Sequence, residues 1–308
     1  MLKSICYNYK ELRTELSSLG DHFLTKSDTE VLLYAWAEWQ SNSLRRLVGM
    51  FAFAVYDKSY AKVTLVRDGF GIKPLYYWFD NNSFCFGSEL CAITDLVPNK
   101  AMPNWHVINN YLSSGRVDRG EYTFFDGVRH LLPGHFLDID LNCNSSITPK
   151  KWWHPNFSED SKITFNEAKD ILREKFLANV KLQLRSDVPL GAALSGGIDS
   201  SAVVCAMHYL EPNSDIKTFS YVPTGSSKNE EKWVDIVNEH VGAKAYKIDV
   251  KKTDIFNDFE TLIKIQGEPF GSPSIYAQYR VFKEIAKAGV VVNLDGQGAD
   301  ELLAGYFG

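Results

Sequence analysis

The sequence has no long apolar run and no clustered cysteines. No stretch approaches the ~20 apolar residues that a membrane-spanning helix requires, and the opening "MLKSICYNYKELRTEL" is too polar for a signal peptide. The five cysteines are scattered and form no CxxC pair, so neither a zinc site nor a disulfide framework is indicated. These absences favour a cytoplasmic protein with reduced thiols.

The chain also lacks an excess of positive charge. Its 33 Lys and Arg residues against 38 Asp and Glu residues give a formal net charge of −5, which argues against a general electrostatic grip on nucleic acid. Hydrophobic residues make up 45% and charged residues 23% of the 308 residues, as in soluble globular proteins of two domains. We expect small-molecule partners, no nucleic acid and no membrane; a homodimer is compatible with the sequence.

The first half of the chain has the pattern of short strands. The runs 49–57, 61–68 and 83–89 carry aromatic and β-branched residues between turn signals. A helix is predicted over 28–40, because apolar residues recur there at helical spacing. This half therefore predicts an antiparallel sheet layered with helices.

The second half alternates helices and strands. The turn-rich segment 140–163 predicts a linker, which gives domains of about 1–150 and 151–308. The predicted helices cover 164–184, 199–210 and 229–242, and the predicted strands cover 189–194, 217–222, 243–250 and 289–295, with two further helices before the last strand. Such alternation predicts an α/β domain with a parallel sheet and helices on both faces.

The motif "SGGIDSS" (195–201) follows one predicted strand and opens a helix. Gly196 and Gly197 remove side chains where the backbone turns, which exposes N–H groups to a ligand, and the helix adds its positive end. Asp199 would be repelled by a bare phosphate, so a Mg²⁺ ion between them is indicated. No lysine follows the glycines, which excludes a Walker A loop. The alternative is a simple strand-to-helix turn with a serine cap.

The motif "LDGQGADELLAGY" (294–306) follows another buried-type strand. In a parallel sheet its glycine loop faces the same edge as the first loop. Asp199 and Asp300 could therefore share one Mg²⁺ on a phosphate chain. The alternative is that Asp300 and Glu301 only complement a helix dipole.

Five motifs together resemble the glutamine-dependent asparagine synthetase family. The matching stretches, in the family's order, are "SDTEV" (27–31), "RDGFGIKPLYY" (67–77), "LLPGH" (131–135), "SGGIDSS" (195–201) and "GQGADELLAGY" (296–306). The resemblance implies an N-terminal glutaminase domain of the Ntn-hydrolase fold and a C-terminal, doubly wound ATP pyrophosphatase domain. The implied reaction adenylates the aspartate side chain with ATP, releases pyrophosphate, and forms asparagine with ammonia from glutamine.

The resemblance also implies a set of ligand-binding residues. The loop Ser195–Ser201 would hold the pyrophosphate part of ATP, with Asp199 and Asp300 as Mg²⁺ ligands. The implied nucleotide contacts are Leu194, Ser195, Gly196, Gly197, Ser200, Ser201, Tyr221, Asp295 and Gly296. Of the glutamine contacts, only Asp28 carries over, and a helix N-terminal carboxylate is the equal alternative for it.

The glutaminase half departs from the family pattern. Family members place a cysteine directly after the initiator methionine, as nucleophile and base through its own amine, whereas Leu2 follows Met1 here. Cys6 has no free α-amine, and Lys3 and Ile5 stand where the family has asparagine and glutamate. We therefore expect an inactive glutaminase half in a chain truncated at both ends.

The synthetase half departs at one residue. Where the family often has a glutamate proposed to take a proton from ammonia, this chain has Gln297, which is no base near neutral pH. A β-lactam synthetase-like adenylating ligase stays open as an alternative. A non-catalytic product that binds nucleotide or pairs with a full-length subunit also stays open.

Overall fold

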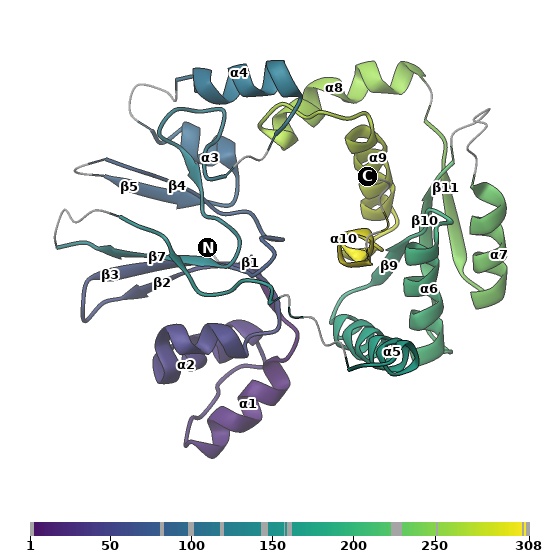
Figure 1. The fold of residues 1–308 in the computed structure, drawn as a ribbon, viewed down its shortest axis with the longest axis horizontal. Helices are drawn as coiled ribbons and strands as arrows, with labels where there is room; N and C mark the ends of the chain where they lie inside the picture. The colour runs from purple at the N-terminus through teal and green to yellow at the C-terminus, as the bar shows by residue number, and fades with distance from the viewer. Residues whose placement is uncertain are drawn as a thin grey trace. The chain divides into compact units, whose positions relative to one another are not determined.

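The computed structural model divides the chain into two units, each described by itself (Figure 1). It describes residues 3–80, 83–97, 102–117, 120–142, 147–156, 158, 162–222, 230–250, 252–303 and 305. The first unit comprises Met1–Ser158 and Ile263–Gly271, and the second comprises Glu159–Leu262 and Ser272–Gly308. The placement of 263–271 in the first unit has no counterpart in the sequence analysis.

The first unit contains two antiparallel sheets. The five-stranded sheet has the order β1 (Lys3–Cys6), β2 (Gly49–Asp57), β3 (Lys62–Arg67), β7 (His135–Asp140) and β8 (Lys150–Lys151). The three-stranded sheet has the order β5 (Phe84–Gly87), β4 (Tyr76–Phe79) and β6 (Arg129–His130). The three strands predicted from the sequence are confirmed as β2, β3 and β5.

Strand alternation explains how the first unit is layered. Successive side chains of β2 point to opposite faces, so Ala52 packs with Tyr77 of the second sheet, whereas Phe51 and Phe53 pack with Trp36 of the predicted helix, α2 (Asp28–Trp39). The remaining helices are α1 (Tyr9–Ser18), η1 (Gln40–Arg46), α3 (Leu90–Thr94) and α4 (Trp105–Ser114). The unit is thus helix on sheet on sheet.

The last strand of the first unit leads to two tryptophans that anchor the following chain. The indole Nε1 of Trp152 donates to the Arg67 carbonyl at 3.2 Å, and its ring stacks on Phe51 with a centroid distance of 6.1 Å. Trp153 covers Gly69, where an added Cβ would lie 2.9 Å from the indole. Both tryptophans thus anchor this segment to the first unit.

The second unit contains a four-stranded parallel sheet. Its order is β11 (Lys244–Ile248), β10 (Lys217–Tyr221), β9 (Leu190–Ala193) and β12 (Val292–Leu294). Its helices are α5 (Phe165–Gln183), α6 (Ile198–Leu210), α7 (Glu231–Val241), α8 (Lys252–Gln266), α9 (Ser274–Lys287) and α10 (Ala299–Leu303). The predicted α/β fold class is confirmed, and β12 is shorter than the predicted 289–295.

Helices cover both faces of the parallel sheet (Figure 1). Helices α5, α6 and α7 pack on one face around Ala192 and Leu294. Helix α9 packs on the other face, where Val281 and Ile285 contact Phe219. A side chain of this kind contributes about 2 kcal/mol when it leaves water, so these apolar faces fix the helices on the sheet.

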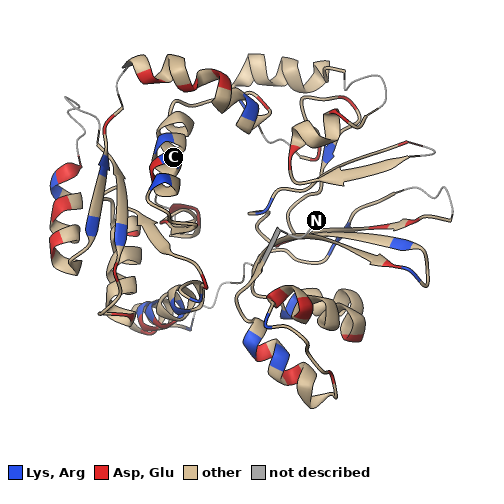
Figure 2. Ribbon diagram, turned by 180° about the vertical axis from the view of Figure 1, so that it is seen from behind, with Lys and Arg blue, Asp and Glu red and all other residues tan. Residues whose placement is uncertain are grey.

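Local signals explain where the helices begin and how they meet solvent. Helix α5 starts at a capping box, in which Thr164 Oγ1 accepts from Glu167 N at 3.3 Å and the Glu167 carboxylate accepts from Thr164 N at 2.9 Å. Acidic and basic residues are interspersed along α5, and α7 carries three acidic residues and one lysine (Figure 2), as expected of helices with one solvated face. Within the described residues, every helix is too short or too polar to cross a bilayer.

Candidate active site

The strand order creates a topological switch point between β9 and β12. From β9 the chain proceeds outward through β10 to β11, and then returns to place β12 on the opposite side of β9. Parallel sheets bind ligands at such a switch point, beyond the carboxyl ends of the strands. The two glycine motifs follow β9 and β12, so both lie at this point.

The loop after β9 requires glycine for its backbone conformation. Gly196 has φ +87°, in the left-handed region that only glycine adopts easily. An added Cβ there would also lie 2.9 Å from the carbonyl oxygen of Glu230. Gly197 differs, because its φ is −71° and the nearest atom to an added Cβ is Ser195 Oγ at 3.3 Å. Gly196 is therefore explained by structure alone, whereas a Cβ at Gly197 would meet the hydroxyl of Ser195 and no backbone atom within 4 Å.

Two serines of the first motif hold the loop in shape. The Ser195 backbone N–H donates to Ser200 Oγ at 3.2 Å, the two hydroxyls lie 3.0 Å apart, and Gly197 N donates to Ser195 Oγ at 3.2 Å. Ser200 is buried. These hydroxyls, predicted as phosphate donors, thus also bind one another. The Ser201 backbone N–H donates to the Gly197 carbonyl at 3.1 Å as the first bond of α6.

The N-terminus of α6 has backbone donors without a side-chain cap. Its N-cap residue is Gly197, which offers no side-chain acceptor, and Asp199 lies in the first turn. Free N–H groups and the helix dipole favour an anion at this position. The side chain of Leu194 lies in the core cluster of the second unit, and its predicted contact with the nucleotide stays a prediction.

The loop after β12 lies directly against the start of α6. An added Cβ at Gly296 would lie 2.8 Å from Ser200 N and 2.9 Å from Asp199 Cβ. Within this loop, Gln297 N donates to Asp295 Oδ1 at 3.1 Å. The absence of a side chain at Gly296 therefore lets the two glycine loops touch. Ala304 and Tyr306 of the second motif lie outside the described residues.

Each motif also carries a partly buried carboxylate. Asp199 lies in the first turn of α6 and Asp300 in the first turn of α10. Carboxylate oxygens are ligands that Mg²⁺ prefers, and the ion commonly uses one or two of them together with phosphate oxygens and water. No cluster of three or more His, Cys, Asp or Glu occurs among the described residues. The donor set thus fits Mg²⁺ held jointly with a phosphate chain.

Tyr221 ends β10, next to β9, at the same edge of the sheet. Its residue is 40% exposed, so its ring is accessible to a ligand. Aromatic rings of this kind stack on nucleobases. The predicted contact with adenine or ribose stays a prediction.

The predicted glutamine-binding residue Asp28 is already engaged within the first unit. Its Oδ2 accepts from the backbone N–H of Cys6 at 3.1 Å, which ties β1 to the start of α2. Burial, followed by the Asp28 carboxylate, raises the pKa of the Cys6 thiol to about 12. Cys6 is therefore a protonated core thiol near neutral pH. Cys143, Met1 and Leu2 lie outside the described residues.

The loop "RDGFGIKPLYY" is a self-contained turn. Asp68 is 1% exposed, and its carboxylate accepts backbone N–H groups of Phe51, Phe70, Ile72 and Lys73 at 3.0 to 3.3 Å. Arg67 donates to three backbone carbonyls, those of Gly71, Lys73 and Leu131. These bonds favour the structural interpretation of the loop over a binding loop.

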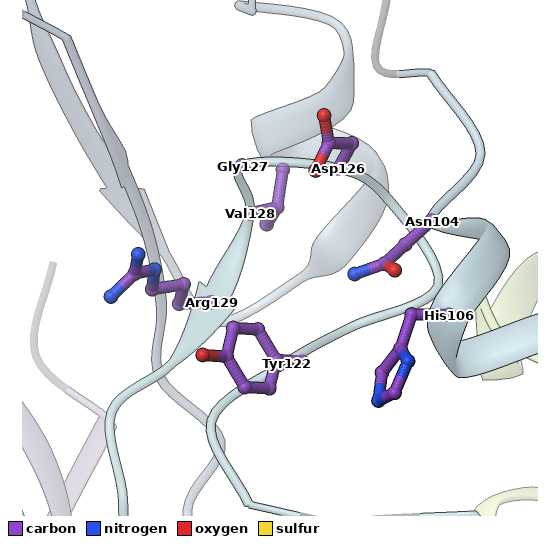
Figure 3. A pocket seen from close by; sticks show the side chains of 7 residues that line it. All are labelled: Asn104, His106, Tyr122, Asp126, Gly127, Val128 and Arg129. Carbon is purple, nitrogen blue, oxygen red and sulfur yellow. The ribbon is translucent and has the colours of Figure 1, made fainter. Parts of the chain in front are cut away.

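The first unit also has a pocket of about 340 Å³, which the sequence does not predict. Figure 3 shows its lining residues, which are Asn104, His106, Tyr122, Asp126, Gly127, Val128 and Arg129. They come from β6, the start of α4 and the loops beside them, and no short motif marks them.

The fold and the site together define a two-domain protein with an antiparallel first unit and a parallel, loop-bearing second unit. Family comparison assigns both. Residues 2–153 match the glutamine amidotransferase domain family, and residues 171–307 match the asparagine synthase family. The two halves thus match a glutamine amidotransferase domain and an asparagine synthase family, and the resemblance to the asparagine synthetase family is confirmed.

Individual relatives agree with this assignment. Asparagine synthetase [glutamine-hydrolyzing] 1 of Bacillus subtilis (strain 168) is 33% identical over 97% of this chain and 46% of its own length. Asparagine synthetase [glutamine-hydrolyzing] 3 of the same organism is 30% identical over 97% of this chain and 50% of its own length. The putative asparagine synthetase [glutamine-hydrolyzing] 2 of Methanocaldococcus jannaschii is 32% identical over 97% of this chain and 57% of its own length.

The chain spans about half the length of these curated relatives. Among solved structures, the glutamine-dependent NAD+ synthetase of Acinetobacter baumannii in complex with ADP has a TM-score of 0.33 and 13% identity, covering 97% of this chain and 73% of that chain. A score this low carries no argument, so the fold assignment rests on the strand order and the domain families.

Proposed function

We propose that this chain carries the catalytic loops of an ATP-dependent, AMP-forming amide ligase of the asparagine synthetase type. The aspartate side-chain carboxylate attacks the α-phosphorus of ATP, the bond to pyrophosphate breaks, and ammonia then displaces AMP from the aspartyl-adenylate. Glutamine or free ammonia is the nitrogen source. The observation that supports this most is the contact of Gly296 with Asp199 and Ser200, which joins the two motifs at the switch point of the sheet.

The chain's residues take distinct roles in this proposal. The backbone N–H groups at Gly197 and the start of α6 bind the charge that develops on the leaving pyrophosphate. Asp199 and Asp300 hold Mg²⁺, which when bound neutralises phosphate charge. Tyr221 lies beside the adenine or ribose.

Gln297 lies in the loop after β12, beside the contact between the motifs. It orients the attacking ammonia through hydrogen bonds, because its amide takes up no proton near neutral pH. Ammonia must therefore lose its proton to water or to another group.

The nitrogen source is the least constrained part of the proposal. The Cys6 thiol is buried and protonated, so it does not serve as a glutaminase nucleophile. Asp28 could still bind the amine of glutamine, but its Oδ2 already accepts from Cys6 N. Free ammonia is thus the better donor for a first assay.

The test measures pyrophosphate release that depends on both ATP and aspartate, with ammonia or glutamine as nitrogen source. We expect release by the wild type, and a loss of about 100-fold in Asp199→Ala, the size seen when one stabilising group is removed from a transition state. Asp215→Ala is the matched control, because Asp215 is an exposed acid in the same unit. Equal release by Asp199→Ala and the wild type would remove the assigned role of Asp199.

Two alternatives give other outcomes in the same assay. A β-lactam synthetase-like ligase would release pyrophosphate only with a different carboxylate acceptor. A chain that only binds nucleotide would bind MgATP in calorimetry and release no pyrophosphate with any acceptor.

A further inference from the structure

One short segment of the second half of the chain is part of the first unit. Ile263–Gly271 belongs to the first unit, whereas Leu262 before it and Ser272 after it belong to the second. The chain thus leaves the second unit at the end of α8 and re-enters it at the start of α9. We call Ile263–Gly271 the excursion.

The base of the excursion is closed inside the second unit. Asp258 of α8 is 5% exposed, and its carboxylate accepts from Lys283 Nζ at 2.7 Å, Arg280 at 2.8 Å and the Tyr276 hydroxyl at 3.1 Å, all on α9. A buried carboxylate with three charged or polar donors is a specific attachment point. It fixes α8 to α9 on the side where the excursion begins, and α9 itself begins three residues after the excursion ends.

The tip of the excursion is bound inside the first unit by Glu268. Its Oε1 accepts from the backbone N–H of Phe124 at 2.8 Å, and its Oε2 lies 3.8 Å from Nε2 of His130. The Glu268 side chain is 15% exposed and the His130 side chain 13% exposed. The hydroxyl of Tyr111 adds a bond to the Phe270 carbonyl at 3.3 Å. A mostly buried carboxylate in this setting requires these donors, because burying it unpaired is costly.

The chain that follows the excursion forms α9 and β12 and then reaches the candidate active site. Helix α9 packs on β10 through Val281 and Ile285, and the chain then forms β12 and the loop with Gly296 and Asp300. A displaced excursion would therefore shift α9, which packs on β10 and continues through residues 288–291 into β12. Packed helices transmit such shifts because cores deform little.

We propose that Glu268 is a positioning residue: by fixing the excursion in the first unit, it sets α9 and thereby the loop that contributes Asp300 to nucleotide binding. This inference rests on the proposed nucleotide site. A side chain that binds Phe124 and His130 in the first unit thereby affects affinity in the second.

The experiment compares the full chain with Glu268→Ala and Glu268→Gln, and uses Glu38→Ala as the control because Glu38 is exposed on α2. Hydrogen exchange is measured for peptides that cover the excursion and Phe124, and MgATP affinity is measured by calorimetry. Thermal unfolding establishes that each variant is folded. Glu268→Gln keeps an oxygen that can accept from Phe124 N, so it tests rescue by a conservative change.

We expect Glu268→Ala to speed exchange in the excursion about 10-fold, as for the loss of a hydrogen bond to a charged group. MgATP affinity should fall about 5-fold or more, the lower range of site-to-site coupling. Glu268→Gln should recover part of both losses, and Glu38→Ala should match the wild type.

Unchanged exchange in folded Glu268→Ala would show that Glu268 does not hold the excursion. Faster exchange with MgATP affinity within about 2-fold of the wild type would show that the excursion does not govern the loop. A wild type that binds no MgATP would overturn the proposed function and the coupling with it, whereas the exchange data would still decide the holding role of Glu268.

Discussion

The two candidate sites of this chain differ in how their polar groups are used. At the β9–β12 switch point, the start of α6 has no side-chain cap, because its N-cap residue is Gly197. In the first unit, the Asp28 carboxylate already accepts from Cys6 N, and Cys6 itself is 2% exposed. The first site has backbone N–H donors that no side chain caps. In the second site, the Asp28 carboxylate is already hydrogen-bonded to the backbone of the same unit.

This difference shows how a binding site is distinguished from a structural one. Buried polar groups are nearly always paired in proteins, so an unpaired set at a strand edge indicates a ligand. Asp258 and Asp68 in the same chain are carboxylates whose donors are all supplied by the protein. Substituting a paired carboxylate should affect stability, and substituting an unpaired one should affect binding.

The largest effect is expected for Asp258→Asn, which removes a paired carboxylate. Burial tends to raise the pKa of Asp258, but hydrogen bonds from Lys283, Arg280 and Tyr276 outweigh it and lower the pKa. The substitution should cost about 3 kcal/mol at pH 7, as for breaking a buried ion pair. Urea unfolding measures this cost.

The pH dependence of that cost has a definite sign. A lowered pKa in the folded state contributes stability above the unfolded value of about 3.9, and this contribution is lost as the pH falls through the folded value. The difference between wild type and Asp258→Asn should therefore shrink below about pH 4. A difference that grows on acidification would contradict the paired state of Asp258.

The next largest effect is expected for Gly296→Ala, which breaks the contact between the two glycine loops. The new Cβ would overlap Ser200 N and Asp199 Cβ, so the loops must separate. Pyrophosphate release should fall about 100-fold, because a shift of about 1 Å in a catalytic group has effects of that size. A folded Gly296→Ala chain with the wild-type rate would show that the contact is not used in catalysis.

An intermediate effect separates the two glycines of the first loop. Gly196→Ala should destabilise the protein by about 1–3 kcal/mol, since its φ is +87°. Gly197→Ala should leave the free energy of unfolding within about 0.5 kcal/mol of the wild type. It should nevertheless weaken MgATP binding about 10-fold, because the methyl group covers the backbone donors.

Urea unfolding and calorimetry on both variants test this separation. If Gly197→Ala binds MgATP as the wild type does, the backbone N–H groups at the start of α6 do not bind phosphate.

The smallest effect is expected at Cys6, in the site whose groups are satisfied. With ammonia as the donor, Cys6→Ala should release pyrophosphate within about 2-fold of the wild type, at a cost in stability of about 1 kcal/mol. In the wild type, iodoacetamide at pH 7.5 should label exposed Cys91 and leave Cys6 unlabelled, since the pKa of Cys6 is about 12. Rapid labelling of Cys6 in the folded protein would contradict its burial.

The sequence predicted the elements that position the candidate site. Parallel strands bring their carboxyl ends to one edge, so the motifs after β9 and β12 could be expected to meet there. Pairing of Leu294 with Ala192 places the strands side by side. The helices could likewise be predicted from their apolar periodicity, because this signal is local in the sequence.

Other features depend on contacts that no local pattern encodes. Glu268 and Phe124 are 144 residues apart, and nothing near either residue specifies the pairing. The two-residue strands β6 and β8 are too short to show a period. The bond between Asp28 and Cys6 likewise became visible only when β1 and α2 were placed together. The two domain assignments, 1–150 and 151–308, and the roles of the site residues stay predictions.

The central claim is that Asp199 and Asp300 bind one divalent cation together with the phosphates of ATP. Replacing Mg²⁺ with Fe²⁺ in the ATP complex, adding peroxide and ascorbate, and mapping the backbone cuts by mass spectrometry tests it directly. We expect cuts in both loops, at 195–201 and 295–300, that require ATP and disappear in Asp199→Ala. Cuts confined to one loop, or unchanged without ATP, would contradict it.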